Sequence, residues 1–224
     1  MTISICARCP ETGSLGMAIS SSSPAVAARC AHARAGVGVV SSQNITDPSL
    51  GPRTLDRIAA GRTAREALDD VFSGYSAAPW RQLVVVDRHG RSAIFSGEHA
   101  LGVHAEAHGI DCAAAGNLLA DPGVPSAMVA AFERAKGDLA PRLIDALAAG
   151  LNAGGEAGPL HSAGLLVVRD VSWPIADLRV DWAELDPIGQ LRSLWDIYRP
   201  QLEDYVTRSL DPGIAPSYGV PGDL

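Results

Sequence analysis

T-I-S-I-C-A-R-C-P-E-T-G-S-L-G-M-A-I-S-S-S, residues 2–22, indicates how the fold begins. Apolar and small polar residues alternate over 2–8, which is the two-residue period of a β-strand with one face toward a core. A Glu-Thr-Gly turn follows, and the apolar run from Leu15 returns as a second strand. The chain therefore begins with an antiparallel hairpin whose first residue after Met1 is Thr2.

The rest of the chain alternates groups of strands with groups of helices. Strands are predicted over 35–44, 82–87, 92–97, 101–116, 162–169 and 173–182, the last with Trp182 facing inward. Helices are predicted over 50–60, 63–72, 122–136, 138–151 and 187–209, the second starting with a capping box and the last kinked at Pro200. Grouped elements favour an α+β fold with antiparallel sheets over βαβ winding. Two sheets face to face between two helical layers, a four-layer αββα sandwich, fit these counts. We expect one domain over 1–209 and a Pro/Gly-rich tail over 210–224.

Composition and charge limit the classes of binding partner and indicate the cellular compartment. The net charge of −7 provides no basic patch for nucleic acid or an anionic membrane surface. No apolar run is long enough to span a bilayer, and the N-terminus lacks the pattern of a signal peptide. We therefore expect a cytoplasmic protein with four reduced cysteines, although Cys6 and Cys9 form a C-x-x-C sequence. The apolar helices and the tail suggest a homo-oligomer.

Besides the opening hairpin, five further motifs are informative. They are A-R-A-G-V-G-V-V-S-S-Q at 33–43, T-D-P-S-L-G-P-R at 46–53, R-Q-L-V-V-V-D at 81–87, A-G-N-L-L at 115–119 and H-S-A-G-L-L-V-V at 161–168. Together these motifs resemble a bacterial and archaeal family of unknown function, DUF1028. The resemblance extends to about residue 182. It implies an αββα sandwich of the N-terminal nucleophile (Ntn) hydrolase type, a fold that the element order indicates independently. The family has no settled activity to carry over.

Thr2 is the best nucleophile that the sequence offers. In an Ntn hydrolase the side chain of the first residue attacks an amide, and its own α-amine, with an ordinary pKa of roughly 7.7–8.0, takes the proton. Removal of Met1 would give Thr2 both groups, and no nucleophile-elbow G-x-S-x-G competes with it. The alternative is that Thr2 is an ordinary β-branched residue of the first strand.

Polar residues near strand ends are the candidates for binding and oxyanion stabilisation. Asn117, in A-G-N, is the candidate oxyanion donor, and Asn after Gly is also a common turn residue. Ser22, Gln43 and Asn44 at strand ends are candidate substrate-binding residues, and Arg53 could hold a substrate carboxylate. For each of these, a local structural role is the alternative.

Three histidines in one short stretch give a rival hypothesis. If residues 101–116 form a strand, then His104, Glu106 and His108 project from one face as a 2-His-1-carboxylate set for zinc or iron. The alternative is a solvated polar strand face.

The sequence therefore predicts an amide hydrolase that acts on a small molecule or short peptide and needs no cofactor, with Thr2 as nucleophile. A non-catalytic binding protein of the same fold and a metal-dependent hydrolase remain the alternatives.

Overall fold

A computed structural model describes residues 2–220 of the chain as a mixed α+β fold with two antiparallel sheets. The larger sheet has six strands in the order β10-β9-β2-β1-β8-β7, and every neighbouring pair is antiparallel. In chain order its strands are β1 (Thr2–Arg8), β2 (Leu15–Ser21), β7 (Ala105–Gly109), β8 (Cys112–Asn117), β9 (Ser162–Val168) and β10 (Ala176–Val180). The opening hairpin, β1 and β2, therefore lies at the centre of this sheet.

The smaller sheet has four strands in the order β3-β4-β5-β6, also antiparallel throughout. They are β3 (Ala31–Arg34), β4 (Gly38–Asn44), β5 (Arg81–Asp87) and β6 (Ser92–Ser96). Strand β1 contacts β4 and β5, and β8 contacts β5, so the two sheets pack against each other through their central strands.

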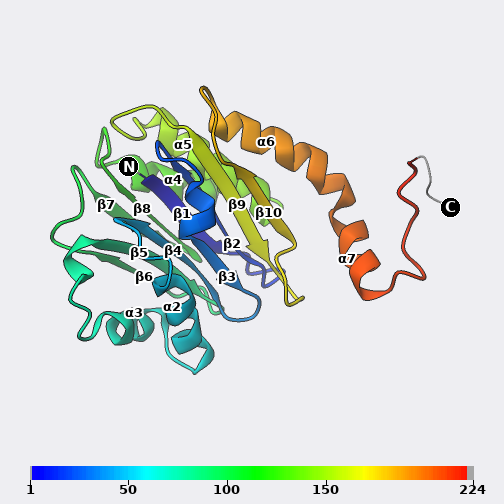
Figure 1. Ribbon diagram of the computed structural model, residues 1–224, viewed down its shortest axis with the longest axis horizontal. Coiled ribbons are helices and arrows are strands. Elements are labelled where there is room, and N and C mark those ends of the chain that lie inside the picture. Colours follow the sequence, from blue (N-terminus) through cyan, green and yellow to red (C-terminus); the bar gives the residue numbers. More distant parts are fainter. Residues whose placement is uncertain (1, 221–224) are drawn as a thin grey trace.

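Helices cover the outer side of each sheet (Figure 1). On the larger sheet, α4 (Val124–Arg134) and α5 (Leu139–Asn152) lie over β1, β2, β7 and β8, and α6 (Pro187–Tyr198) lies over β9 and β10. On the smaller sheet, α2 (Leu50–Ala59) and α3 (Ala64–Phe72) lie over β4 and β6. The remaining elements are the short α1 (Val26–Cys30), the 3-10 turns η1 (Ala78–Trp80) and η2 (Arg199–Gln201), and α7 (Leu202–Leu210).

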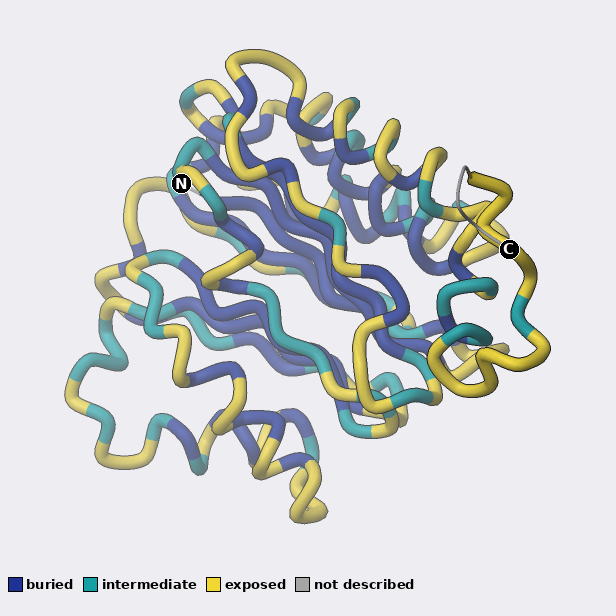
Figure 2. The backbone as a smooth tube through the Cα atoms, turned by 45° about the vertical axis from the view of Figure 1, so that its right-hand side comes forward, coloured by how far each residue is buried: buried dark blue, intermediate teal, exposed yellow. Residues whose placement is uncertain are grey.

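Strand β1 is buried on both faces because it lies between helices and a second sheet. Ile3 and Ile5 pack with the residues under α4 and α5, whereas Cys6 packs with the residues between the two sheets. Full burial of such aliphatic side chains contributes about 1.5–3 kcal/mol each. Figure 2 shows this buried centre in dark blue, with exposed residues concentrated in the loops and in the C-terminal arm. The predicted alternation of β1 is therefore real, but both of its faces are inside the protein.

Most predicted elements are present, and two local predictions are wrong. The capping box is confirmed: Thr63 Oγ1 accepts from the backbone N–H of Glu66, and the Glu66 carboxylate accepts from that of Thr63. The last helix is interrupted at Pro200 as predicted, by η2. The single strand over 101–116 is wrong, because a turn at Asp111, with a positive φ of 58°, divides it into β7 and β8. Trp182 is 51% exposed rather than inward-facing, since β10 ends two residues earlier.

In the described part of the chain, no helix is long and apolar enough to cross a membrane. The division into one domain over 1–209 and a tail over 210–224 stays a prediction.

Candidate functional site

Thr2 is the first residue of β1 and lies among three strand ends. Its partner in the sheet is Asn117, the last residue of β8, and Ile3 is paired with Ser20 near the end of β2. Only 5% of Thr2 is exposed. Because directly opposite residues of antiparallel strands share a face, the Thr2 and Asn117 side chains project to the same side of the sheet. The structure therefore brings together the two residues that were predicted to be catalytic.

Asn117 is fully buried and only partly used as a hydrogen-bonding group. Its Nδ2 donates to Gln82 Oε1 at 3.0 Å, and its Oδ1 has no partner among the described residues. An amide nitrogen carries two hydrogens, so one N–H remains after the bond to Gln82. The side chain can thus donate to a substrate while it is held from the other sheet.

A buried polar network between the sheets orients Asn117. Gln43 Nε2 donates to Gln82 Oε1 at 2.8 Å, so this one oxygen accepts from both amides. Ser4 and Ser41 donate to Gln43 Oε1 at 2.6 and 3.0 Å, and Gln82 Nε2 donates to Ser96 Oγ at 2.9 Å. Gln43, predicted to bind substrate, is fully buried and belongs to this network. Connected buried networks fix side-chain orientation, which is the role the geometry gives Gln43 and Gln82.

Glu156 is the residue at this end of the sheet that sequence reasoning missed. It is 5% exposed, and its backbone forms an isolated bridge with Leu119, two residues beyond Asn117. Its Oε2 accepts from the backbone N–H of Ser22 at 3.2 Å, whereas Oε1 has no partner among the described residues. Burial raises the pKa of the Glu156 carboxyl to about 7, against smaller lowering effects from the positive charge of the chain's amino terminus and from Ser22. The group is therefore able to gain or lose a proton near neutral pH.

The loop after β2 is held by polar contacts with β9. Ser22, predicted to bind substrate, is partly exposed and contributes its backbone N–H to Glu156. Ser162 Oγ donates to the carbonyl of Ser23 at 2.6 Å. His161 donates its backbone N–H to Ser21, and its ring stacks on Trp182 with centroids 4.3 Å apart. These contacts fix the loop on one side of Thr2.

Asn44 and Arg53 contact loops of the protein itself. Asn44 has a positive φ of 71°, donates through Nδ2 to the carbonyl of Trp80 at 2.6 Å, and accepts from the N–H of Leu101 at 3.2 Å. Arg53 donates to the carbonyl of Val71 at 3.5 Å, with its guanidinium 5.8 Å from the Tyr75 ring. The structure thus gives both residues a role in holding loops, and it does not bring Arg53 to Thr2 in any described contact.

The histidine-rich stretch forms no gathered set of metal ligands. His104, Glu106 and His108 are all exposed, and His108 Nδ1 lies 2.8 Å from Ser92 Oγ. Within residues 2–220, no group of three or more His, Cys, Asp or Glu side chains is arranged to hold a metal ion. The four cysteines are free and buried, and burial raises the pKa of Cys112 to about 12.

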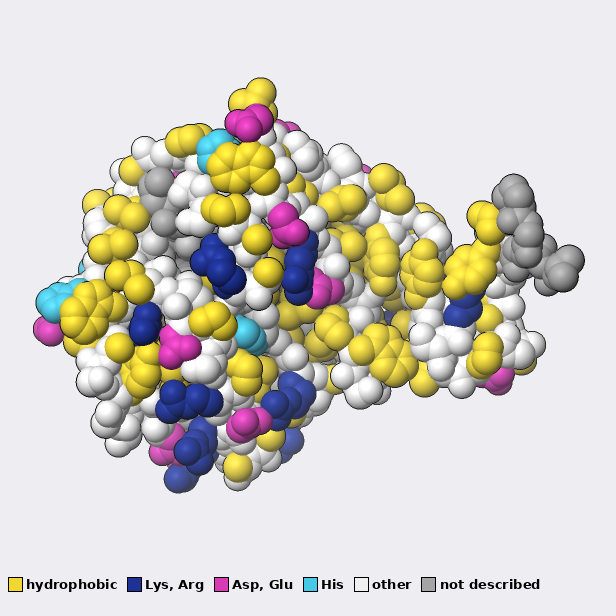
Figure 3. Space-filling view, in the orientation of Figure 1, with side chains coloured by type: hydrophobic (Ala, Val, Ile, Leu, Met, Phe, Trp, Pro, Cys, Tyr) yellow, Lys and Arg dark blue, Asp and Glu magenta, His cyan; other side chains and the backbone are white. Residues whose placement is uncertain are grey.

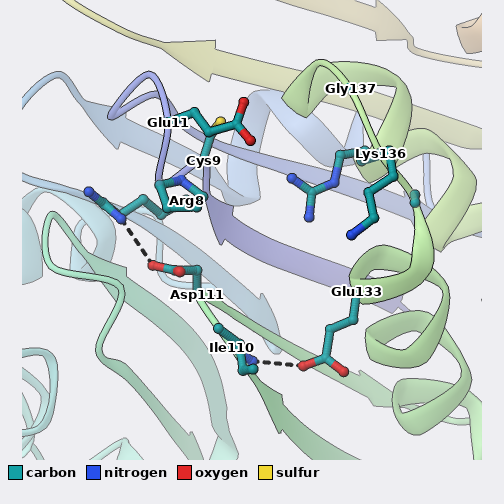
Figure 4. A pocket seen from close by; sticks show the side chains of 11 residues that line it. Arg8, Cys9, Glu11, Ile110, Asp111, Glu133, Lys136 and Gly137 are labelled. Carbon is teal, nitrogen blue, oxygen red and sulfur yellow. Dashed lines mark hydrogen bonds and ion pairs between the residues drawn. The ribbon is translucent and has the colours of Figure 1, made fainter.

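Two cavities lie at the other end of β1. One has a volume of about 290 Å³ and is lined by residues that include Arg8, Glu11 and Lys136; an adjoining one measures about 320 Å³. Figure 4 shows Glu11 and Lys136 reaching toward the first cavity, with Arg8 held by Asp111 at 3.2 Å. Thr2 lines neither cavity, because it is at the opposite end of the seven-residue strand.

Comparison with known proteins identifies a family and a solved structure of similar fold. Residues 2–191 match DUF1028, a family of unknown function. The solved structure of protein SPO2555 from Silicibacter pomeroyi, described as a DUF1028 protein, is 30% identical, with a TM-score of 0.84 over 91% of this chain and 89% of that chain. Anbu, an ancestral β-subunit from Yersinia bercovieri, is 10% identical and aligns over 91% of this chain and 97% of its own. Its TM-score of 0.38 is too low to indicate a shared fold. No curated protein matches.

Proposed function

The chain belongs to DUF1028, a family of unknown function, and within it we propose that this protein is an N-terminal nucleophile amide hydrolase. Thr2 is the nucleophile after Met1 is removed, and the substrate is a small molecule or a short peptide. The observation that carries the proposal is the pairing of Thr2 with Asn117, a buried amide with one N–H that no described residue accepts, beside the candidate nucleophile.

The proposed reaction uses groups of Thr2 for both attack and proton transfer. Thr2 Oγ1 attacks the amide carbonyl carbon while the α-amine of Thr2 takes the hydroxyl proton. Asn117 donates a hydrogen bond to the oxyanion that forms, an interaction typically worth about 10²–10³ in rate. The C–N bond then breaks, the leaving nitrogen takes the proton, and an ester remains on Thr2. Water hydrolyses the ester through the same amine, which releases the acid and restores Thr2.

The arrangement of layers supports this assignment. Two antiparallel sheets contact each other through β1, β4, β5 and β8, with helices on the outer side of each. We infer that this is the four-layer αββα sandwich of Ntn hydrolases, in which the nucleophile begins a central strand. The start of β1 at the middle of the larger sheet is consistent with that inference.

Covalent trapping tests the proposal. The chain is prepared so that it begins at Thr2 and is then treated with a β-lactone, an electrophile that acylates N-terminal hydroxyls. We expect one adduct by intact mass, located on the peptide that contains Thr2. Thr2→Ser keeps a hydroxyl and should react, whereas Thr2→Ala should not.

Thr54→Ala provides a matched control, because Thr54 is a buried threonine whose hydroxyl donates to the carbonyl of Leu50 within α2. It should leave acylation of Thr2 in place. A folded chain that begins at Thr2 and forms no adduct would favour the alternative, a non-catalytic binding protein of this fold. Adduct formation equal in Thr2→Ala and wild type would place the reactive group elsewhere.

A further inference from the structure

Two side-chain atoms of nearly fully buried residues, unsatisfied within the described part of the chain, lie at the start of β1. Within residues 2–220, five buried side-chain atoms lack a hydrogen-bond partner: Arg8 Nε, His32 Nε2, Asn117 Oδ1, Arg142 Nε and Glu156 Oε1. Of the five side chains, only those of Asn117 and Glu156 belong to residues that are more than nine-tenths buried. Both residues lie beside the start of β1. Their two unsatisfied oxygens could therefore bind a group of a ligand, or the amine that removal of Met1 would create.

The Glu156 carboxyl is held between the two strands that flank β1. On one side, the backbone N–H of Ala157 donates to Leu118 at 2.9 Å, and that of Ala120 donates to Gly155 at 3.1 Å, just beyond the end of β8. On the other side, Oε2 accepts from Ser22, just beyond the end of β2. Since β1 lies between β2 and β8, a residue whose backbone is held at the end of β8 and whose carboxyl is held at the end of β2 lies beside the start of β1.

Burial of an unpaired carboxylate is costly, so the site favours a cation. Among the described residues, no Arg, Lys or His side chain forms an ion pair with Glu156. The positive charge that lowers its pKa is that of the amino terminus of the chain that begins at Met1, not of Thr2. An unpaired buried carboxylate beside the start of β1 therefore suits an α-ammonium group, and removal of Met1 would create one at Thr2.

We propose that, once the chain begins at Thr2, Glu156 binds the α-ammonium group of Thr2 through Oε1 and is a positioning residue for the catalytic base. This inference rests on the proposed function, because it concerns the amine that accepts the proton of Oγ1. With Oε2 held by Ser22, the carboxylate keeps the amine beside Oγ1. Its negative charge also favours the protonated amine, which raises the pKa of that amine.

Competitive labelling of amines tests the pairing without any substrate. A chain that begins at Thr2 has two primary amines, the α-amine and the side chain of Lys136, the only lysine in the sequence. A trace amount of an amine-acylating reagent is added over a pH series, and mass spectrometry gives the labelling of each peptide. Lys136 is the internal reference.

In Glu156→Gln we expect the α-amine to label at least about tenfold faster relative to Lys136 at neutral pH, because its pKa falls by about one unit or more. Glu156→Asp keeps the charge and should restore most of the wild-type ratio. Glu156→Ala also removes the charge and serves in place of the Gln variant if that variant does not fold. Glu106→Gln, which removes an exposed carboxylate on β7, should leave the ratio unchanged.

Equal labelling midpoints in wild type and Glu156→Gln would overturn the pairing. This outcome is independent of the acylation of Thr2 by a β-lactone. A chain that is acylated at Thr2 but shows no effect of Glu156 on the α-amine would retain the proposed function and lose this inference. A chain in which Glu156 affects the α-amine but Thr2 is not acylated would retain this inference and lose the proposed function.

Discussion

Glu156 combines two properties that seldom occur together in one carboxyl group: nearly complete burial and an oxygen with no hydrogen-bond partner among the described residues. Burial raises its pKa from 4.5 to about 7. Between these two pH values the folded protein holds a proton that the unfolded chain has released. The stability of the fold therefore decreases as the pH rises from about 4.5 to about 7. Above about pH 7 the whole free-energy cost of burying the ionised carboxyl is present.

Replacement of this carboxyl by an amide gives a stability prediction with a defined sign. In the chain that retains Met1, in which Glu156 is not paired with the Thr2 amine, Glu156→Gln should stabilise the protein by up to about 3 kcal/mol at pH 8, from a shift of about 2.5 pKa units, and should have little effect at pH 4.5. Urea denaturation of both proteins at the two pH values measures the difference. A stability change that is the same at both pH values would show that ionisation of Glu156 is not its cause.

At the scale of single residues, the sequence identifies only part of the site. Thr2 follows Met1, and Asn117 follows Gly116 at the end of a predicted strand, so both can be singled out by eye. Glu156 lies in a G-G-E-A-G-P loop with no pattern to indicate burial, and its partner Ser22 is 134 residues away in the sequence. Only the folded arrangement brings the two together.

At the scale of elements, local signals were sufficient where the interacting residues are close together in the sequence. The capping box of α3 and the β5–β6 hairpin depend on neighbouring residues, and both are present. The division of β7 from β8 depends on an Ile110–Asp111 turn, which carries neither Gly nor Pro. Asp tolerates the left-handed conformation that such a turn requires, but its presence alone does not predict one.

The contact of β5 with β8 depends on Gln82, which sequence reasoning did not single out. Its Oε1 accepts from both Gln43 and Asn117. Gln82→Leu leaves these buried donors without their acceptor, and we expect a loss of about 2–4 kcal/mol in the free energy of unfolding. Chemical denaturation measures it.

Gln190→Leu is the matched control, because Gln190 is exposed; we expect a change within about 0.5 kcal/mol. If Gln82→Leu were equally mild, the network between the sheets would not hold Asn117 in place.

At the scale of the whole molecule, the grouping of strands and helices was enough to predict an α+β fold with antiparallel sheets. Strand order could not be predicted, because it depends on pairs such as β1 with β8, which lie more than a hundred residues apart. Figure 3 shows hydrophobic side chains on the surface near α6 and the C-terminal arm, where Leu185, Ile197 and Leu210 are exposed. The homo-oligomer stays a prediction.

The proposed chemistry depends on one peptide bond, between Met1 and Thr2. Only its cleavage creates the α-amine that serves as the base and, in our inference, binds Glu156. Intact-mass analysis of the protein purified from the cells that make it tests this most directly. We expect a mass that corresponds to residues 2–224, with Thr2 as an unmodified first residue. A mass that retains Met1 would contradict it.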